Sequence, residues 1–114
     1  MNNKDIIKHL ISPEHQIKSA IKKLSMLGRL RKNKFCLVVG KRRNILGTVT
    51  DGDIRRGLLQ NYNINEKVEK IYKKRPLVTR KTLSSNEIKN ILNKKGITFL
   101  PLVNKKNEIL DIYD

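Results

Sequence analysis

The sequence predicts an α/β (α+β) fold of two β-α-β-β-α repeats, residues 1–62 and 63–114, packed sheet to sheet about a pseudo-twofold axis with the last helix missing. The first supporting observation is an internal repeat. FCLVVGKRRNILGTVT from Phe35 and FLPLVNKKNEILDIYD from Phe99 share an apolar run, a polar turn and an Ile-Leu pair, at a constant offset of 64 residues (99 minus 35). The second is a helical spacing of apolar residues upstream of each stretch. One such unit cannot bury both faces of its sheet, whereas two packed units can.

The predicted elements of the first half are a strand, a helix, a hairpin and a second helix. Leu10-Ile11 is the candidate edge strand. Four apolar residues then recur at i, i+4, i+7 and i+10, as in an amphipathic helix, namely Ile17, Ile21, Leu24 and Leu27. The two apolar runs after Phe35, with a polar turn between them, are typical of a β-hairpin. The second helix is expected from Gly52 to Gln60, with Ile54 and Leu58 facing inward.

The second half repeats this order as far as its hairpin. Its candidate edge strand is Leu77-Val78-Thr79, and the apolar residues of its expected helix are Ile88, Ile91 and Leu92. Ser84 and Glu87 stand three positions apart, as a capping box requires, and Gly96 is expected to end the helix. The counterpart of the 52–60 helix is missing.

Charge and composition limit the classes of function. Lys and Arg total 26 against 10 acidic residues, and this net charge of +16 favours anionic partners. A genome-wide bias toward Lys, Asn and Ile would account for it equally well. Cys36 is the single cysteine, which excludes an intrachain disulfide and a Cys-based metal site and predicts a buried thiol. With no signal peptide and no run long enough to span a membrane, we expect a cytoplasmic protein with no membrane contact.

The residues ILGTVTDGDIRRGLL (45–59) resemble the end of a cystathionine-β-synthase (CBS) domain, and the repeat resembles a tandem CBS pair, or Bateman module, over residues 6–114. TDGDIRR is similar both to the CBS pair that precedes a sugar-nucleotidyltransferase domain and to the pair that follows a sugar-phosphate isomerase domain. The pair begins within a few residues of Met1, which favours the first arrangement. The resemblance implies a regulatory homodimer attached to a catalytic domain, which senses an adenosine ligand such as AMP, ADP or ATP and requires no cofactor.

The resemblance assigns the hydroxyl of Thr50 to a ligand phosphate and the carboxylate of Asp53 to ribose hydroxyls. A hydroxyl can donate to a phosphate oxygen, and a carboxylate can accept from two vicinal hydroxyls. Both residues lie at the expected N-terminus of a helix, where free N–H groups and the helix dipole favour an anion. Gly47 would let the ligand or the facing half approach the backbone closely. Thr48 points to the opposite face from Val49 by strand alternation.

Further candidates surround this GTVTDGD motif (47–53). Lys34, at the start of the first hairpin, and Arg55 or Arg56, on the following helix, could add positive charge near a phosphate. A cleft between the two halves is a usual place for a small ligand. The candidates for lining it from the second half are Pro76, Val78 and Thr79.

A purely structural interpretation of the motif remains open. Thr50 or Asp51 could be the N-cap of the helix, with Asp53 near N3 accepting backbone N–H groups. In the second half, Asp111 and Asp114 stand 64 residues after the glycine and the second threonine of the motif. Two carboxylates repel a phosphate at close range, so one ligand site is expected rather than two.

Two other functions stay open: a dimerisation or assembly module with an empty cleft, and a basic nucleic-acid-binding domain. Nucleic acid is the less favoured partner, because aromatic residues make up only 4% and no helix-turn-helix, RNA-recognition or zinc motif is present. Catalysis by the chain itself is not indicated, since no Ser-His-Asp set, metal cluster or GxxxxGK loop is found. The sequence therefore predicts neither catalytic nor metal-binding residues.

Overall fold

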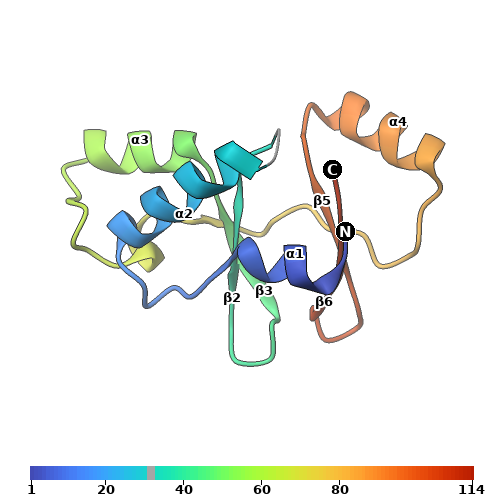
Figure 1. Cartoon of the computed structure of the whole chain (residues 1–114), viewed down its shortest axis with the longest axis horizontal. Helices are drawn as coiled ribbons and strands as arrows, with labels where there is room; N and C mark the ends of the chain where they lie inside the picture. The colour runs from blue at the N-terminus through green and yellow to red at the C-terminus, as the bar shows by residue number, and fades with distance from the viewer. Residues whose placement is uncertain (31–32) are drawn as a thin grey trace.

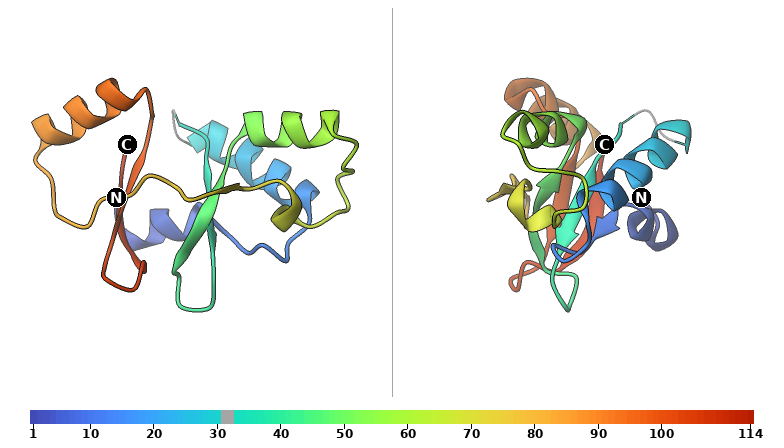
Figure 2. Two further views of the ribbon diagram at one scale, coloured as in Figure 1. Left: turned by 180° about the vertical axis from the view of Figure 1, so that it is seen from behind. Right: turned by 90° about the vertical axis from the view of Figure 1, so that its left-hand side faces the viewer.

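Two β-hairpins lie side by side at the centre of the molecule, and helices lie on their outer sides (Figure 1). The computed structural model describes residues 1–30 and 33–114. The elements are, in chain order, α1 (Asn3–Lys8), β1 (Leu10–Ile11), α2 (Ile17–Leu30), β2 (Cys36–Val39), β3 (Ile45–Val49), α3 (Asp51–Leu59), the 3₁₀ helix η1 (Val68–Lys70), β4 (Lys73–Lys74), α4 (Ser85–Lys95), β5 (Leu100–Val103) and β6 (Ile109–Tyr113). α2 and α3 lie outside the β2–β3 hairpin, α4 lies outside the β5–β6 hairpin, and α1 packs against β6 (Figures 1 and 2).

The strands form one sheet of four strands, in the order β1-β2-β3-β4, and one pair, β5-β6. β1 runs parallel to β2, so the predicted edge strand is confirmed, and the other pairs are antiparallel. The predicted strand at 77–79 is reduced to a parallel bridge between Thr79 and Leu102. The N–H of Thr79 donates to the carbonyl of Pro101 at 2.9 Å. The ladder stops there because its next bond would need the N–H that Pro101 lacks.

The backbone preserves the 64-residue offset of the sequence. The register shift at Val38/Val39 recurs at Leu102/Val103. In the hairpin turns, Arg43 has φ 61° and Asn107 has φ 63°, both in the left-handed region. The two hairpins are therefore two copies of one local structure.

The turns of the two hairpins hold each other through a reciprocal pair of hydrogen bonds. The N–H of Ile45 donates to the carbonyl of Asn107 at 2.8 Å, and the N–H of Ile109 donates to the carbonyl of Arg43 at 3.1 Å. Each bond is the other one moved by 64 residues. This contact confirms the predicted pseudo-twofold arrangement of two α+β repeats.

Apolar side chains form two core clusters. One includes Leu24 of α2, Val49 of β3 and Ile54 of α3. The other joins the two hairpins and contains Phe35, which is fully buried and stacks on Phe99 with the ring centroids 4.0 Å apart. The ring of His9 stacks on Phe35 at 4.1 Å. Phe35 is thus a core residue, whereas Phe99 is only half-buried.

The helix after the first hairpin differs from the prediction in one side chain. Ile54 is buried as expected, but the expectation that Leu58 faces inward is wrong, because 44% of it is exposed. Gly57 is buried instead. A Cβ at Gly57 would lie 2.5 Å from Cγ2 of Ile71. The segment after η1 thus packs directly on the backbone of α3 at Gly57, and this contact leaves Leu58 facing solvent.

The other two predicted helices are confirmed. In α2 the buried residues are Ile17, Ala20, Leu24 and Leu27, so Ile21 lies at the edge of the buried stripe with 36% exposed. α4 has the predicted capping box, in which the N–H of Ser84 donates to Glu87 Oε1 at 3.0 Å and the N–H of Glu87 donates to Ser84 Oγ at 3.2 Å. Gly96, with φ 64°, ends α4 in the left-handed conformation that favours glycine.

The sequence did not predict three of the described elements, namely α1, η1 and β4. In α1, the side chain of Asn2 caps the helix by accepting from the N–H of Asp5 at 2.8 Å. β4 consists of two exposed lysines and has no apolar alternation. It pairs with β3, so a segment of the second half joins the sheet of the first half. Among the described helices, none combines the length and the apolar character needed to cross a membrane.

Candidate functional site

A cleft of about 450 Å³ lies where the GTVTDGD motif meets the second half of the chain. The end of β3, the start of α3, the segment from β4 onward and the loop between α4 and β5 all contribute to it. Its lining residues are Thr48, Thr50, Asp53, Arg56, Lys73, Arg75, Pro76, Leu77, Gly96, Ile97, Thr98 and Phe99. The cleft therefore brings together five of the candidates singled out in the sequence, namely Thr48, Thr50, Asp53, Arg56 and Pro76.

Asp53 is the most heavily engaged residue of the cleft. It is buried, with 7% exposed. Its Oδ2 accepts the backbone N–H of Thr50 at 2.9 Å and the hydroxyl of Thr50 at 3.2 Å. Its Oδ1 accepts from the guanidinium of Arg56 at 2.6 Å. Thr50 is the N-cap of α3 and Asp53 stands at N3, so the capping interpretation of the motif is confirmed. The same two side chains also line the cleft.

Strand alternation places the residues before the cap. Thr48 lines the cleft, whereas the side chain of Val49 belongs to the core cluster with α2 and α3. Gly47 is not among the lining residues. A Cβ at Gly47 would lie 2.2 Å from the carbonyl oxygen of Lys73 and 2.4 Å from the ring of Tyr72. The segment that approaches the backbone at Gly47 is therefore β4, and the glycine allows β4 to pair there.

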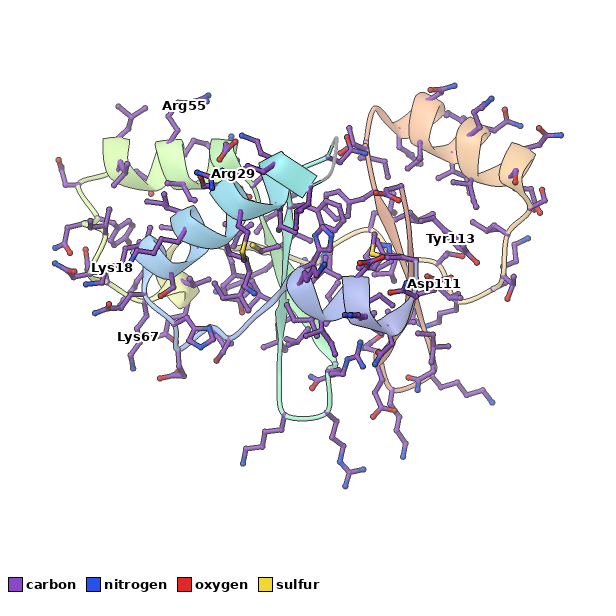
Figure 3. The ribbon with its side chains drawn as sticks, viewed as in Figure 1. Lys18, Arg29, Arg55, Lys67, Asp111 and Tyr113 are labelled. Carbon is purple, nitrogen blue, oxygen red and sulfur yellow. The ribbon has the colours of Figure 1, made fainter. Side chains whose placement is uncertain are left out.

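The remaining candidates lie elsewhere. Lys34 binds the carboxylate of Asp51 at 2.8 Å and is not among the lining residues. Arg55 projects outward from α3 (Figure 3). Val78 packs against the core between the hairpins, and the hydroxyl of Thr79 donates to the carbonyl of Lys81 at 3.1 Å. Of the three second-half candidates, only Pro76 lines the cleft.

Two cationic residues of the cleft, Lys73 and Arg75, were not predicted from the sequence. Neither side chain makes a hydrogen bond or an ion pair with any other residue in the described ranges 1–30 and 33–114. Since Arg56 is paired with Asp53, the cleft carries uncompensated positive charge. The signal for them in the sequence is the basic run KKRP at 73–76.

The cleft also has an apolar part, formed by Pro76, Leu77, Ile97 and Phe99. An apolar wall next to a few convergent polar groups is typical of small-molecule sites. The arrangement suits a ligand with one planar or apolar part, hydroxyl groups for a carboxylate, and an anionic part.

The second half has a different arrangement at the equivalent positions. Asp111 Oδ1 accepts from the N-terminal amine of Met1 at 2.9 Å and from the backbone N–H of Ile112 at 2.8 Å. The hydroxyl of Tyr113 accepts from the N–H of Leu83 at 3.3 Å. Asp111 and Tyr113 lie on β6 close to α1 (Figure 3). That the second motif holds no nucleotide stays a prediction.

Groups with other chemistry are few. Burial raises the pKa of the Cys36 thiol to about 12, so the predicted buried thiol is confirmed. Within residues 1–30 and 33–114, no group of three His, Cys, Asp or Glu residues is placed to hold a metal ion.

The fold that contains this cleft is that of a CBS domain pair. No protein-family model matches the sequence, and no curated protein matches it. Solved structures do match. The CBS domain pair of protein MJ0100, in complex with 5′-methylthioadenosine and S-adenosyl-L-methionine, has a TM-score of 0.71 at 18% identity, over 91% of this chain and 78% of that chain. The CBS domain protein PAE2072 from Pyrobaculum aerophilum, complexed with AMP, has a TM-score of 0.72 at 14% identity, over 92% and 78%.

A third match is an enzyme. GMP reductase from Trypanosoma brucei, in complex with guanosine 5′-triphosphate, has a TM-score of 0.74 at 23% identity, over 91% of this chain and 24% of that chain. The chain thus spans about a quarter of that protein. At these identities the likeness defines the fold.

Proposed function

We propose that this chain is a regulatory module that senses an adenosine nucleotide or a related compound in the cleft beside Asp53. The observation that carries the proposal is the position of Asp53, a carboxylate that is buried in the protein and also lines the cleft. A buried carboxylate offers a strong acceptor for two ribose hydroxyls. Solved structures that share this fold were determined in complex with AMP, with methylthioadenosine and S-adenosylmethionine, or with GTP. These complexes support a nucleotide-like ligand.

Within this proposal, Thr50 contributes to the polar end of the site and Thr48 to its wall. Thr50 donates its hydroxyl to Asp53, and rotation of that hydroxyl would let it donate to a phosphate. Gly47 supports the site by admitting β4, which carries Lys73. The proposed ligand does not contact Lys34, Val78 or Thr79, because none of them lines the cleft.

We further propose that the repeats at 1–62 and 63–114 form one regulatory unit of a longer, cytoplasmic, homodimeric protein. The GMP reductase match supports attachment to an enzyme. A sugar nucleotidyltransferase is our candidate for that enzyme, because TDGDIRR is similar to the CBS pair of such proteins, although it is equally similar to the pair of sugar-phosphate isomerases. Light scattering on the purified chain tests the dimer. A monomer at every concentration up to the millimolar range would contradict it.

Thermal denaturation with AMP, ADP, ATP, S-adenosylmethionine and nucleotide sugars tests the sensing function. A ligand at ten times its Kd should raise Tm by about 5 °C, because it binds only the native state. Asp53→Ala should abolish the shift. Glu87→Ala is the matched control. It removes a carboxylate from the equivalent position, N3, in the capping box of α4, and Glu87 does not line the cleft.

Two results would favour the alternatives. No shift with any compound at millimolar concentration would favour a dimerisation or assembly module with an empty cleft. Binding of DNA or RNA with a steep salt dependence, unchanged by Asp53→Ala, would favour a basic nucleic-acid-binding domain.

A further inference from the structure

The uncompensated charge of the cleft comes from one short segment. Lys73 stands opposite Thr48 in the β3–β4 pairing, and side chains of directly opposed residues lie on the same face of a sheet. Thr48 lines the cleft, so Lys73 lines it too. Lys74 points to the other face, where its Nζ lies 5.9 Å from the centre of the Tyr72 ring. Arg75 follows two residues after Lys73 and returns to the cleft.

Arg75 also has an unusual backbone. Its φ of 57° lies in the left-handed region, which few residues other than glycine adopt. It precedes Pro76, and a residue before proline normally takes an extended conformation. Strained residues of this kind cluster at ligand sites, where the surrounding structure holds them. Arg75 has this conformation at the point where the chain leaves β4, and it lines the cleft.

We propose that Lys73 and Arg75 form a phosphate subsite, so that the cleft prefers nucleotides with two or three phosphates to nucleosides and to uncharged or cationic adenosine compounds. The inference rests on the proposed function, and it adds the class of ligand. Among the described residues that line the cleft, Asp53 is the only acidic one, and Arg56 already neutralises it. A ligand that brings several negative charges gains from both cations, whereas a sulfonium compound such as S-adenosylmethionine does not.

Isothermal titration of the whole chain with adenosine, AMP, ADP, ATP and S-adenosylmethionine, at one fixed ionic strength, tests the subsite. The expected order of affinity is ATP, ADP, AMP, adenosine, with about tenfold between AMP and ATP. Lys73→Ala and Arg75→Ala should each lower the affinity for ATP about tenfold and leave that for adenosine within about twofold. Lys105→Ala is the matched control, because it removes the same charge from the exposed turn between β5 and β6, away from the lining residues of the cleft, and it should change neither affinity.

Glycine substitutions separate the effect of the Arg75 side chain on binding from the effect of its left-handed backbone on stability. Arg75→Gly and Asn61→Gly both replace a residue of positive φ, and Asn61 lies in the exposed turn after α3, not among the lining residues of the cleft. Both variants should keep Tm or raise it, because glycine adopts this conformation without strain. Only Arg75→Gly should lose the preference for ATP.

Three results would overturn the subsite. Equal affinities for adenosine, AMP and ATP would contradict it while leaving the proposed function intact. Equal losses with Lys73→Ala and Lys105→Ala would show that net charge acts without a built site. Absence of binding by every compound would contradict the subsite and the proposed function together.

Discussion

The guanidinium of Arg56 lies 2.6 Å from the carboxylate of Asp53, one helical turn earlier on α3. The two partners differ in exposure, since 7% of the side chain of Asp53 and 66% of that of Arg56 are accessible to solvent. A buried carboxylate is thus held by a cation that solvent can reach. A ligand that uses Asp53 for its ribose hydroxyls has to displace Arg56 or share the carboxylate with it.

Replacing Arg56 therefore has opposite consequences for nucleosides and nucleotides. Arg56→Gln should raise the affinity for adenosine about twofold, because an ion pair one turn apart on a helix, with its cation in solvent, contributes only about 0.4 kcal/mol. The affinity for ATP should not rise, since a cation of the cleft is lost as well. Titration of both ligands checks this, with Arg55→Gln, on the outer face of α3, as the control. A loss of adenosine binding would show that Arg56 holds Asp53 in its binding position.

Gly47 should be required for β4 to pair. A Cβ at Gly47 would lie 2.2 Å from the carbonyl of Lys73, so Gly47→Ala should lower the free energy of unfolding by about 1–3 kcal/mol. It should also weaken ATP binding, because β4 carries Lys73. At Gly52 the nearest atom to a Cβ is Arg56 Nη1, at 3.3 Å, on a flexible side chain. Gly52→Ala should therefore stabilise α3 by about 0.5–1 kcal/mol. Urea denaturation checks both, and equal stability of the two variants would contradict this account.

The capping box of α4 should give a pH-dependent contribution to stability. The backbone N–H of Ser84, and next its side chain, hydrogen-bond the carboxylate of Glu87 and hold the pKa of Glu87 below its ordinary value of 4.5. The folded state thus favours the ionised form. The contribution of these hydrogen bonds to the free energy of unfolding is complete above pH 4.5. It is lost as the pH falls through the lower pKa that Glu87 has in the folded state. In urea denaturation from pH 7 to pH 3, the difference between the wild type and Glu87→Gln should be constant at first and shrink below that value. A difference that persists to pH 3 would be the contrary result.

Much of the fold could be predicted because the two halves share local chemistry. Phe35 and Phe99 mark the same point of each hairpin, and they stack on each other in the folded protein. The Ser84–Glu87 pair and Gly96 mark the two ends of α4, because capping depends on residues close in sequence. Leu58 was misplaced because its orientation depends on Ile71, which approaches α3 at Gly57 from outside the helix.

The cleft was predicted in part for the same reason. Thr48, Thr50 and Asp53 lie in one short motif whose local structure is strand, cap and helix. Lys73 and Arg75 reach the cleft only because β4 pairs with β3, and two exposed lysines carry no strand pattern. Lys34 was expected to lie near the ligand phosphate. In the fold its Nζ lies 2.8 Å from the carboxylate of Asp51 instead.

The central claim is that one nucleotide binds per chain, at Asp53. The most direct measurement is the stoichiometry of ATP binding by isothermal titration of the wild type, Asp53→Asn and Asp111→Asn. Asparagine keeps an acceptor for the N–H of Thr50, so the N-cap of α3 survives in the first variant. The account predicts one site in the wild type and in Asp111→Asn, and at least a tenfold loss of affinity in Asp53→Asn. Two sites per chain, or unchanged affinity in Asp53→Asn, would contradict it.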